Sequence, residues 1–199
     1  MAKRIAELLA PARVASAGLL EGGRTSPPEV VELMASVGVD LSERASRQVS
    51  VDDLDRADLV LTMERQQLRE VAVMTTATWP KTFTMKELVR RGATLGGRLE
   101  GEAAGSWIAR AHAGREPADL IDRAPMDEVA DPFGGTFEEY AATKIELEDL
   151  VDQLGDLLFV PGAVPAVVLA ESPSDPGEEA DAPADQQRGR SRFGLVRRG

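Results

Sequence analysis

The spacing of apolar residues changes along the chain and predicts alternating helices and strands. Apolar positions three or four residues apart predict helices over residues 26–38, 64–74 and 136–158. Short apolar or β-rich runs predict three strands, near residues 13–17, 58–63 and 81–85. The run over 58–63 is mainly apolar, which suits a parallel sheet covered on both faces. The alternation therefore predicts an α/β domain with a parallel sheet.

Polar residues at the ends of these segments mark where the helices begin and end. Ser26 is expected to cap the first long helix, with Pro27 at the first helical position. Capping boxes are predicted at Ser50–Asp53 and at Thr136–Glu139. We also expect the latter part of a helix over 1–9, a glycine-rich loop over 92–105 and short helices over 86–91 and 106–113.

The composition of the 199-residue chain indicates one domain, 1–159, followed by a disordered tail, 160–199. Pro, Asp and Glu dominate the first half of this tail, and Arg dominates its end. No apolar run approaches the ~20 residues of a membrane span, and no signal-peptide pattern is evident, so we expect a cytoplasmic protein without a membrane partner. The net charge of -11 argues against a nucleic-acid partner.

The absence of one residue type restricts the chemistry most. The sequence contains no cysteine and a single histidine, His112. These counts exclude disulfides, cysteine-type metal sites, iron–sulfur clusters, histidine-cluster metal sites and a thiolate nucleophile within this chain. We expect neither a metal nor a cofactor.

Five short motifs in a fixed order carry a resemblance to a known family. They are SAGL at 16–19, GVDLS at 38–42, SRQVS at 46–50, ADLVLTM at 57–63 and DPFGG at 131–135, the last before a long helix. In this order the chain resembles the low-molecular-weight protein tyrosine phosphatases, from residue 1 to about 159. The resemblance implies a three-layer α/β/α fold with a four-stranded parallel sheet in the order 2-1-3-4. The first strand and its phosphate-binding C-x5-R loop have no counterpart here and would lie before Met1.

The resemblance also implies a reaction and two site residues. In the family a cysteine thiolate attacks the phosphorus of a phosphotyrosine-containing protein, an arginine of the loop binds the phosphate oxygens, and an Asp-Pro-aromatic loop supplies the acid for the leaving phenolate. Asp131 matches this general acid, and Phe133 matches an aromatic residue that contacts the substrate. Without the family, Asp131 is typical of an ordinary Asp-Pro turn and Phe133 of a core residue.

An acid alone cannot supply the rate that phosphate-ester hydrolysis requires. General acids contribute typically ~10²–10⁴-fold, whereas enzymes accelerate the hydrolysis of phosphate monoesters by up to ~10²¹-fold. We therefore expect the chain as written to be inactive, as a truncated gene model or a relic. The alternative is a non-catalytic pseudophosphatase that binds phosphoproteins as an adaptor. An arsenate reductase on the same fold would need several thiols, which this chain lacks.

Overall fold

The computed structural model describes residues 12–121 and 124–159. All of them lie in the first of two units into which the chain divides, residues 1–167 and 168–199. The predicted helix over 1–9 and the predicted tail over 160–199 lie outside the described residues. Within the described part of the chain, no helix is long and apolar enough to cross a membrane. The elements in chain order are α2 (Pro28–Ala35), α3 (Val51–Arg56), β1 (Val60–Thr62), α4 (Arg65–Met74), η1 (Thr76–Lys81), β2 (Thr82–Thr84), α5 (Met85–Leu95), α6 (Ala104–His112), η2 (Pro117–Leu120), η3 (Pro125–Asp127) and α7 (Phe137–Phe159).

Two of the three predicted strands form a short parallel sheet. β1 pairs with β2 in parallel, with Val60 opposite Thr82 and Thr62 opposite Thr84. All three residues of β2 are buried, because helices cover it. The chain is therefore an α/β structure with a parallel sheet, as the apolar run over 58–63 predicted.

The third predicted strand, over 13–17, is wrong. These residues form no ladder, and the segment makes a single bridge, between Gly18 and Gln48. The Gly18 N–H donates to the Arg47 oxygen at 2.8 Å, and the Val49 N–H donates to the Gly18 oxygen at 2.8 Å. None of residues 12–50 is buried, so an apolar run there has no neighbouring strand or core to fix it. β propensity without a paired neighbour does not make a strand.

Helix positions were predicted more accurately than strands. The capping boxes at Ser50 and Thr136 are confirmed by reciprocal hydrogen bonds. The expected cap by Ser26 is wrong, since α2 begins one residue later with Pro27 as its N-cap and has no side-chain cap bond. The predicted loop over 92–105 begins too early, because α5 continues through Gly92 to Leu95.

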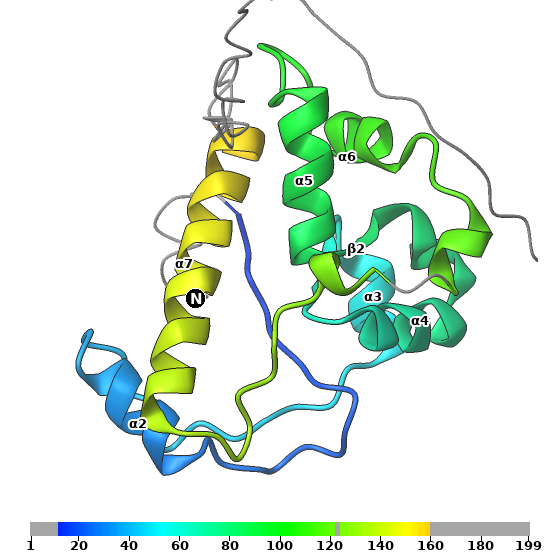
Figure 1. Cartoon of the computed structure of the whole chain (residues 1–199). Helices are drawn as coiled ribbons and strands as arrows, with labels where there is room; N and C mark the ends of the chain where they lie inside the picture. Colours follow the sequence, from blue (N-terminus) through cyan, green and yellow to red (C-terminus); the bar gives the residue numbers. More distant parts are fainter. Residues whose placement is uncertain (1–11, 122–123, 160–199) are drawn as a thin grey trace, which may run out of the picture. The chain divides into compact units, whose positions relative to one another are not determined.

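The core lies where α5 and α7 run side by side against α6 and β2 (Figure 1). Gly92 permits this approach, because a Cβ atom there would stand 2.5 Å from Leu157 Cδ1 and 3.1 Å from Trp107 Cζ2. Trp107 is fully buried, and its Nε1–H donates to the Gly96 oxygen at 2.9 Å. Trp107 therefore serves packing in the core. The other members of the core are Phe83, Met85, Leu88, Val89, Ile108, Ala111, Val129, Leu150, Val151, Leu154, Leu157 and Leu158.

Candidate functional site

The segment that carries Asp131 lies at the carboxyl end of the sheet. The Val129 N–H donates to the backbone oxygen of Met63 at 2.9 Å, and Met63 directly follows β1. Asp131 is only two residues further along. In parallel α/β sheets ligands bind outside the carboxyl ends of the strands. The predicted general acid is therefore at the edge of the sheet where a substrate would bind.

Local hydrogen bonds shape the loop around Asp131. Its Oδ1 accepts a hydrogen bond from the Phe133 N–H at 3.0 Å, and the Gly135 N–H donates to the Pro132 oxygen at 2.8 Å. Gly134 has a φ of 78°, which a residue with a side chain rarely adopts. The Asp131 side chain is exposed, so a bound molecule can reach its carboxylate. The turn expected of an Asp-Pro pair is present, and it is compatible with an acid in that turn.

Phe133 does not belong to the core. Its side chain is 78% exposed, which rules out the packing role that a lone aromatic residue otherwise suggests. The ring is available for contact with a bound molecule, and its role as a substrate contact stays a prediction.

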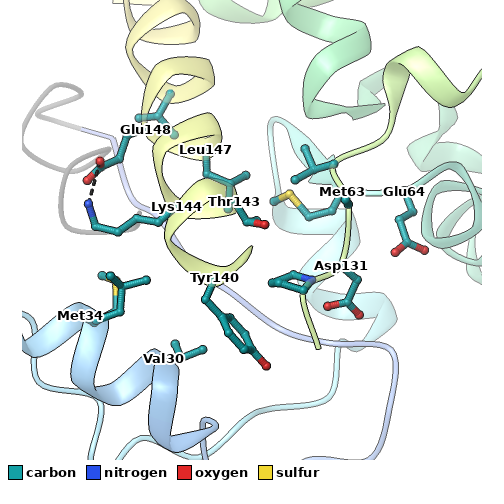
Figure 2. A pocket seen from close by; sticks show the side chains of 15 residues that line it. Val30, Met34, Met63, Glu64, Asp131, Tyr140, Thr143, Lys144, Leu147 and Glu148 are labelled. Atoms are coloured by element: carbon teal, nitrogen blue, oxygen red, sulfur yellow. Dashed lines mark hydrogen bonds and ion pairs between the residues drawn. The ribbon is translucent and has the colours of Figure 1, made fainter. Parts of the chain in front are cut away.

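A pocket of about 290 Å³ opens beside this loop. Figure 2 shows it between α2, α7, the residues that follow β1, and the Asp131 segment. Apolar side chains line most of it, while Lys144 and Glu148 form an ion pair of 2.8 Å at one end. Asp131 and Glu64 lie on the opposite side of the pocket (Figure 2). The full lining is Val30, Leu33, Met34, Met63, Glu64, Val129, Ala130, Asp131, Pro132, Tyr140, Thr143, Lys144, Leu147, Glu148 and Val151.

A buried carboxylate anchors the segment that leads to Asp131. Asp127 accepts two hydrogen bonds of 2.9 Å from Arg90 of α5, and it lies 3.5 Å from Arg65 of α4. This pairing raises the pKa of Arg90, chiefly through its hydrogen bonds to Asp127. The backbone N–H of Arg65 also donates to the Glu128 carboxylate at 3.4 Å. Sequence reasoning missed this network, since Asp127 lies in an irregular stretch and its partners are 37 and 62 residues away.

His112 lies near a second buried ion pair, away from the pocket. The Arg115 guanidinium pairs with Glu87 at 2.9 Å and stacks on the Trp79 ring, 3.7 Å from its centroid. Burial, reinforced by the charges of Arg115 and Arg91, lowers the pKa of His112 below its usual value. Burial also lowers the pKa of Arg115, to about 10. Trp79 packs here, between the Arg115 guanidinium and the His112 ring. Over 12–121 and 124–159, no three His, Asp or Glu side chains gather as metal ligands would.

Comparisons with known proteins match this chain to one family model and to several relatives. The family model described as low molecular weight phosphotyrosine protein phosphatase matches residues 1–96. The probable low molecular weight protein-tyrosine-phosphatase EpsP of Ralstonia solanacearum is 34% identical over 76 residues, which is 38% of this chain and 52% of that protein. A putative arsenate reductase of Halobacterium salinarum is 57% identical over 35 residues, which is 18% of this chain and 25% of that protein. The chain thus spans about half of one of these relatives and a quarter of the other.

Solved structures agree on the fold. A mutant YwlE arginine phosphatase with a phosphorylated active-site serine is 27% identical, with a TM-score of 0.54, covering 77% of this chain and 80% of that chain. The tyrosine phosphatase amsI of Erwinia amylovora has a TM-score of 0.55 at 18% identity, covering 79% of this chain and 82% of that one. The fold is accordingly the three-layer α/β type expected from the sequence.

Proposed function

We propose that this chain belongs to the low molecular weight phosphotyrosine phosphatases, the family whose model matches residues 1–96. From that premise, we propose that the chain supplies the acid and leaving-group side of a phosphoprotein phosphatase site. Asp131 is the general acid in this proposal, and Phe133 contacts the substrate. The observation that carries it is the hydrogen bond from the Val129 N–H to the Met63 oxygen, which places the Asp131 loop at the carboxyl end of β1.

The other half of the reaction requires groups that these 199 residues do not contain. The family mechanism needs a thiolate to attack the phosphorus atom, and the sequence has no cysteine. We therefore propose that the polypeptide as given does not turn over phosphate esters. Purified protein should hydrolyse p-nitrophenyl phosphate no faster than its Asp131→Asn variant. A steady rate that Asp131→Asn abolishes would contradict this proposal.

The role of Asp131 itself is tested on a longer polypeptide. In-frame translation of the DNA upstream of codon 1 shows whether a strand and a C-x5-R loop are encoded there. If they are, Asp131→Asn in that longer protein should lower kcat by about 10²–10⁴-fold, the usual contribution of a general acid. Two variants measured in parallel keep the acid. Asp127→Glu disturbs the anchor that positions the Asp131 segment, and Phe133→Leu removes the proposed aromatic contact with the substrate. An unchanged kcat in Asp131→Asn would remove Asp131 from the mechanism.

The substrate we propose is a phosphoprotein, and the family resemblance by itself gives phosphotyrosine. One structural neighbour is named an arginine phosphatase, so the same fold serves two leaving groups, a phenol and a guanidine.

A further inference from the structure

The imidazole of His112 lies beside a buried guanidinium group that fixes its protonation state. His112 is the last residue of α6, and its Nδ1 atom is 3.3 Å from the Nη1 atom of Arg115. A guanidinium group has hydrogen-bond donors and no acceptor, so Nδ1 must be the acceptor. The contact therefore requires a neutral imidazole with its proton on Nε2. A proton on Nδ1 would replace the hydrogen bond by two donors that face each other.

The surroundings of Arg115 prevent it from turning away from such a proton. Its side chain is 1% exposed, and its guanidinium carbon lies 3.7 Å from the centroid of the Trp79 ring and 4.2 Å from that of Phe83. Glu87 of α5 forms an ion pair with it at 2.9 Å. Two rings and a carboxylate thus hold the guanidinium group in place. Positive charge on His112 can be relieved only if Arg115 leaves this cluster.

The other charged groups around His112 increase the repulsion. Arg91 of α5 donates hydrogen bonds of 2.6 Å to the backbone oxygens of the residues on either side of His112. The η1 turn faces His112 with the uncharged Trp79 ring, 5.6 Å away, while its Lys81 ammonium group bonds to backbone oxygens at the end of α3. Burial and the charges of Arg115 and Arg91 together lower the pKa of His112. An imidazolium at this position would face two guanidinium groups.

The segment 113–121 depends on Arg115 for its attachment near α6. Of the described residues 113–121, Arg115 alone is buried. At the far end of the segment, the Arg65 and Arg69 side chains of α4 donate to backbone oxygens of η2. Release of Arg115 would therefore withdraw the one buried side chain of this segment. Segments with few buried contacts are the ones that open locally without unfolding the protein.

From this geometry we propose that His112 is a proton-operated latch, whose neutral imidazole holds the segment 113–121 against Trp79 and whose protonation releases it. Histidine is the side chain whose ordinary pKa places its change of charge between about pH 5 and 8, and this chain contains a single histidine. Because the pKa of His112 lies below its usual 6.5, the latch is closed at neutral pH and opens in acid. The latch is independent of the proposed function, since none of its residues lines the pocket beside Asp131.

The two tryptophan indoles report the titration in the full 199-residue chain. In ¹H–¹⁵N spectra, lowering the pH from about 7.5 to about 5 should shift the indole N–H signal of Trp79 with the same midpoint as the His112 ring. The Trp107 indole, bonded to the Gly96 oxygen in the core, should keep its position and serves as the internal control. Arg91→Gln removes one facing guanidinium group and should move this midpoint to higher pH.

Amide hydrogen exchange tests the release itself. His112→Asn is the matched variant, because its amide oxygen can accept from Arg115 at every pH and does not titrate. The ratio of exchange rates over 113–121, unaltered protein to His112→Asn, should rise at least about threefold between about pH 7.5 and about pH 5. A ratio that stays constant while His112 titrates would overturn the latch, and so would a Trp79 midpoint that differs from that of His112.

Discussion

Replacing Asp127 by Asn should destabilise the protein far more than the same replacement at an exposed ion pair. Asp127 is 2% exposed and faces two guanidinium groups, of which Arg65 is 6% exposed and Arg90 is 53% exposed. Asn keeps the size of the side chain but removes its charge and one acceptor. Arg65 would then be left as a buried cation with a weakened partner.

The size of the effect follows from the burial of each partner. Removing one member of a buried pair costs about 3–5 kcal/mol, whereas exposed pairs contribute about 0–1 kcal/mol. Because Arg90 is half exposed, solvent screens its ion pair with Asp127. We therefore expect Asp127→Asn to lower the free energy of unfolding by about 2–4 kcal/mol. A domain of ordinary stability, about 5–15 kcal/mol, would remain folded but would unfold at a visibly lower urea concentration.

Asp52→Asn is the matched control for this measurement. Asp52 pairs with Arg56 at 2.8 Å, and both side chains are nearly 80% exposed, at 78% and 79%. Its replacement changes the net charge by the same amount and should cost less than about 1 kcal/mol. Urea unfolding followed by circular dichroism gives both values. Equal losses in the two variants, or a loss below about 1 kcal/mol for Asp127→Asn, would refute the idea that Asp127 anchors the segment before Asp131.

Two other predictions concern the core and the single histidine. Gly92→Ala should lower the free energy of unfolding by about 1 kcal/mol, because the crowding against Leu157 outweighs the helix propensity that alanine gains. The control Gly105→Ala should not destabilise the protein, since a Cβ atom at residue 105 would have nothing within 4 Å. A Gly92→Ala variant as stable as the unaltered protein would disprove the close approach. The imidazole of His112 should titrate at lower pH in the folded protein than in urea, because burial lowers its pKa. Its contribution to stability is then present above the unfolded pKa of about 6.5 and is lost as the pH falls through the folded pKa. Arg91→Gln should raise the folded pKa measured by proton NMR, and identical midpoints in buffer and urea would contradict the assignment.

Local signals in the sequence were sufficient for most helices and for the two paired strands. The capping boxes at Ser50 and Thr136 depend on hydrogen bonds between residues three apart, so sequence spacing alone contains them. The run over 58–63 is mainly apolar and contains the β-branched residues Val60 and Thr62, which made β1 easy to recognise. The segment over 13–17 failed because strand formation depends on a partner that local spacing does not reveal.

The candidate site divides in the same way. Asp131 and Phe133 were found from a short motif, and their types and order are visible in the sequence. The position of Asp131 at the carboxyl end of β1 depends on a long-range hydrogen bond from the Val129 N–H to the Met63 oxygen, which the motif does not reveal. The place of Glu64 in the pocket lining gave no signal in the sequence, since a lone glutamate before a helix is indistinguishable from an ordinary surface charge.

The sequence by itself determined the helical periodicity, the α/β class, the absence of a thiol and the Asp-Pro turn at residue 131. These features depend on residue type and on neighbours within a few positions. Only the tertiary structure decided that Asp127 binds Arg65 and Arg90, that Gly92 lets α5 approach α7, and that Glu64 faces the same pocket as Asp131. Such contacts join residues far apart in the chain, and their strength depends on burial, which a linear pattern does not specify.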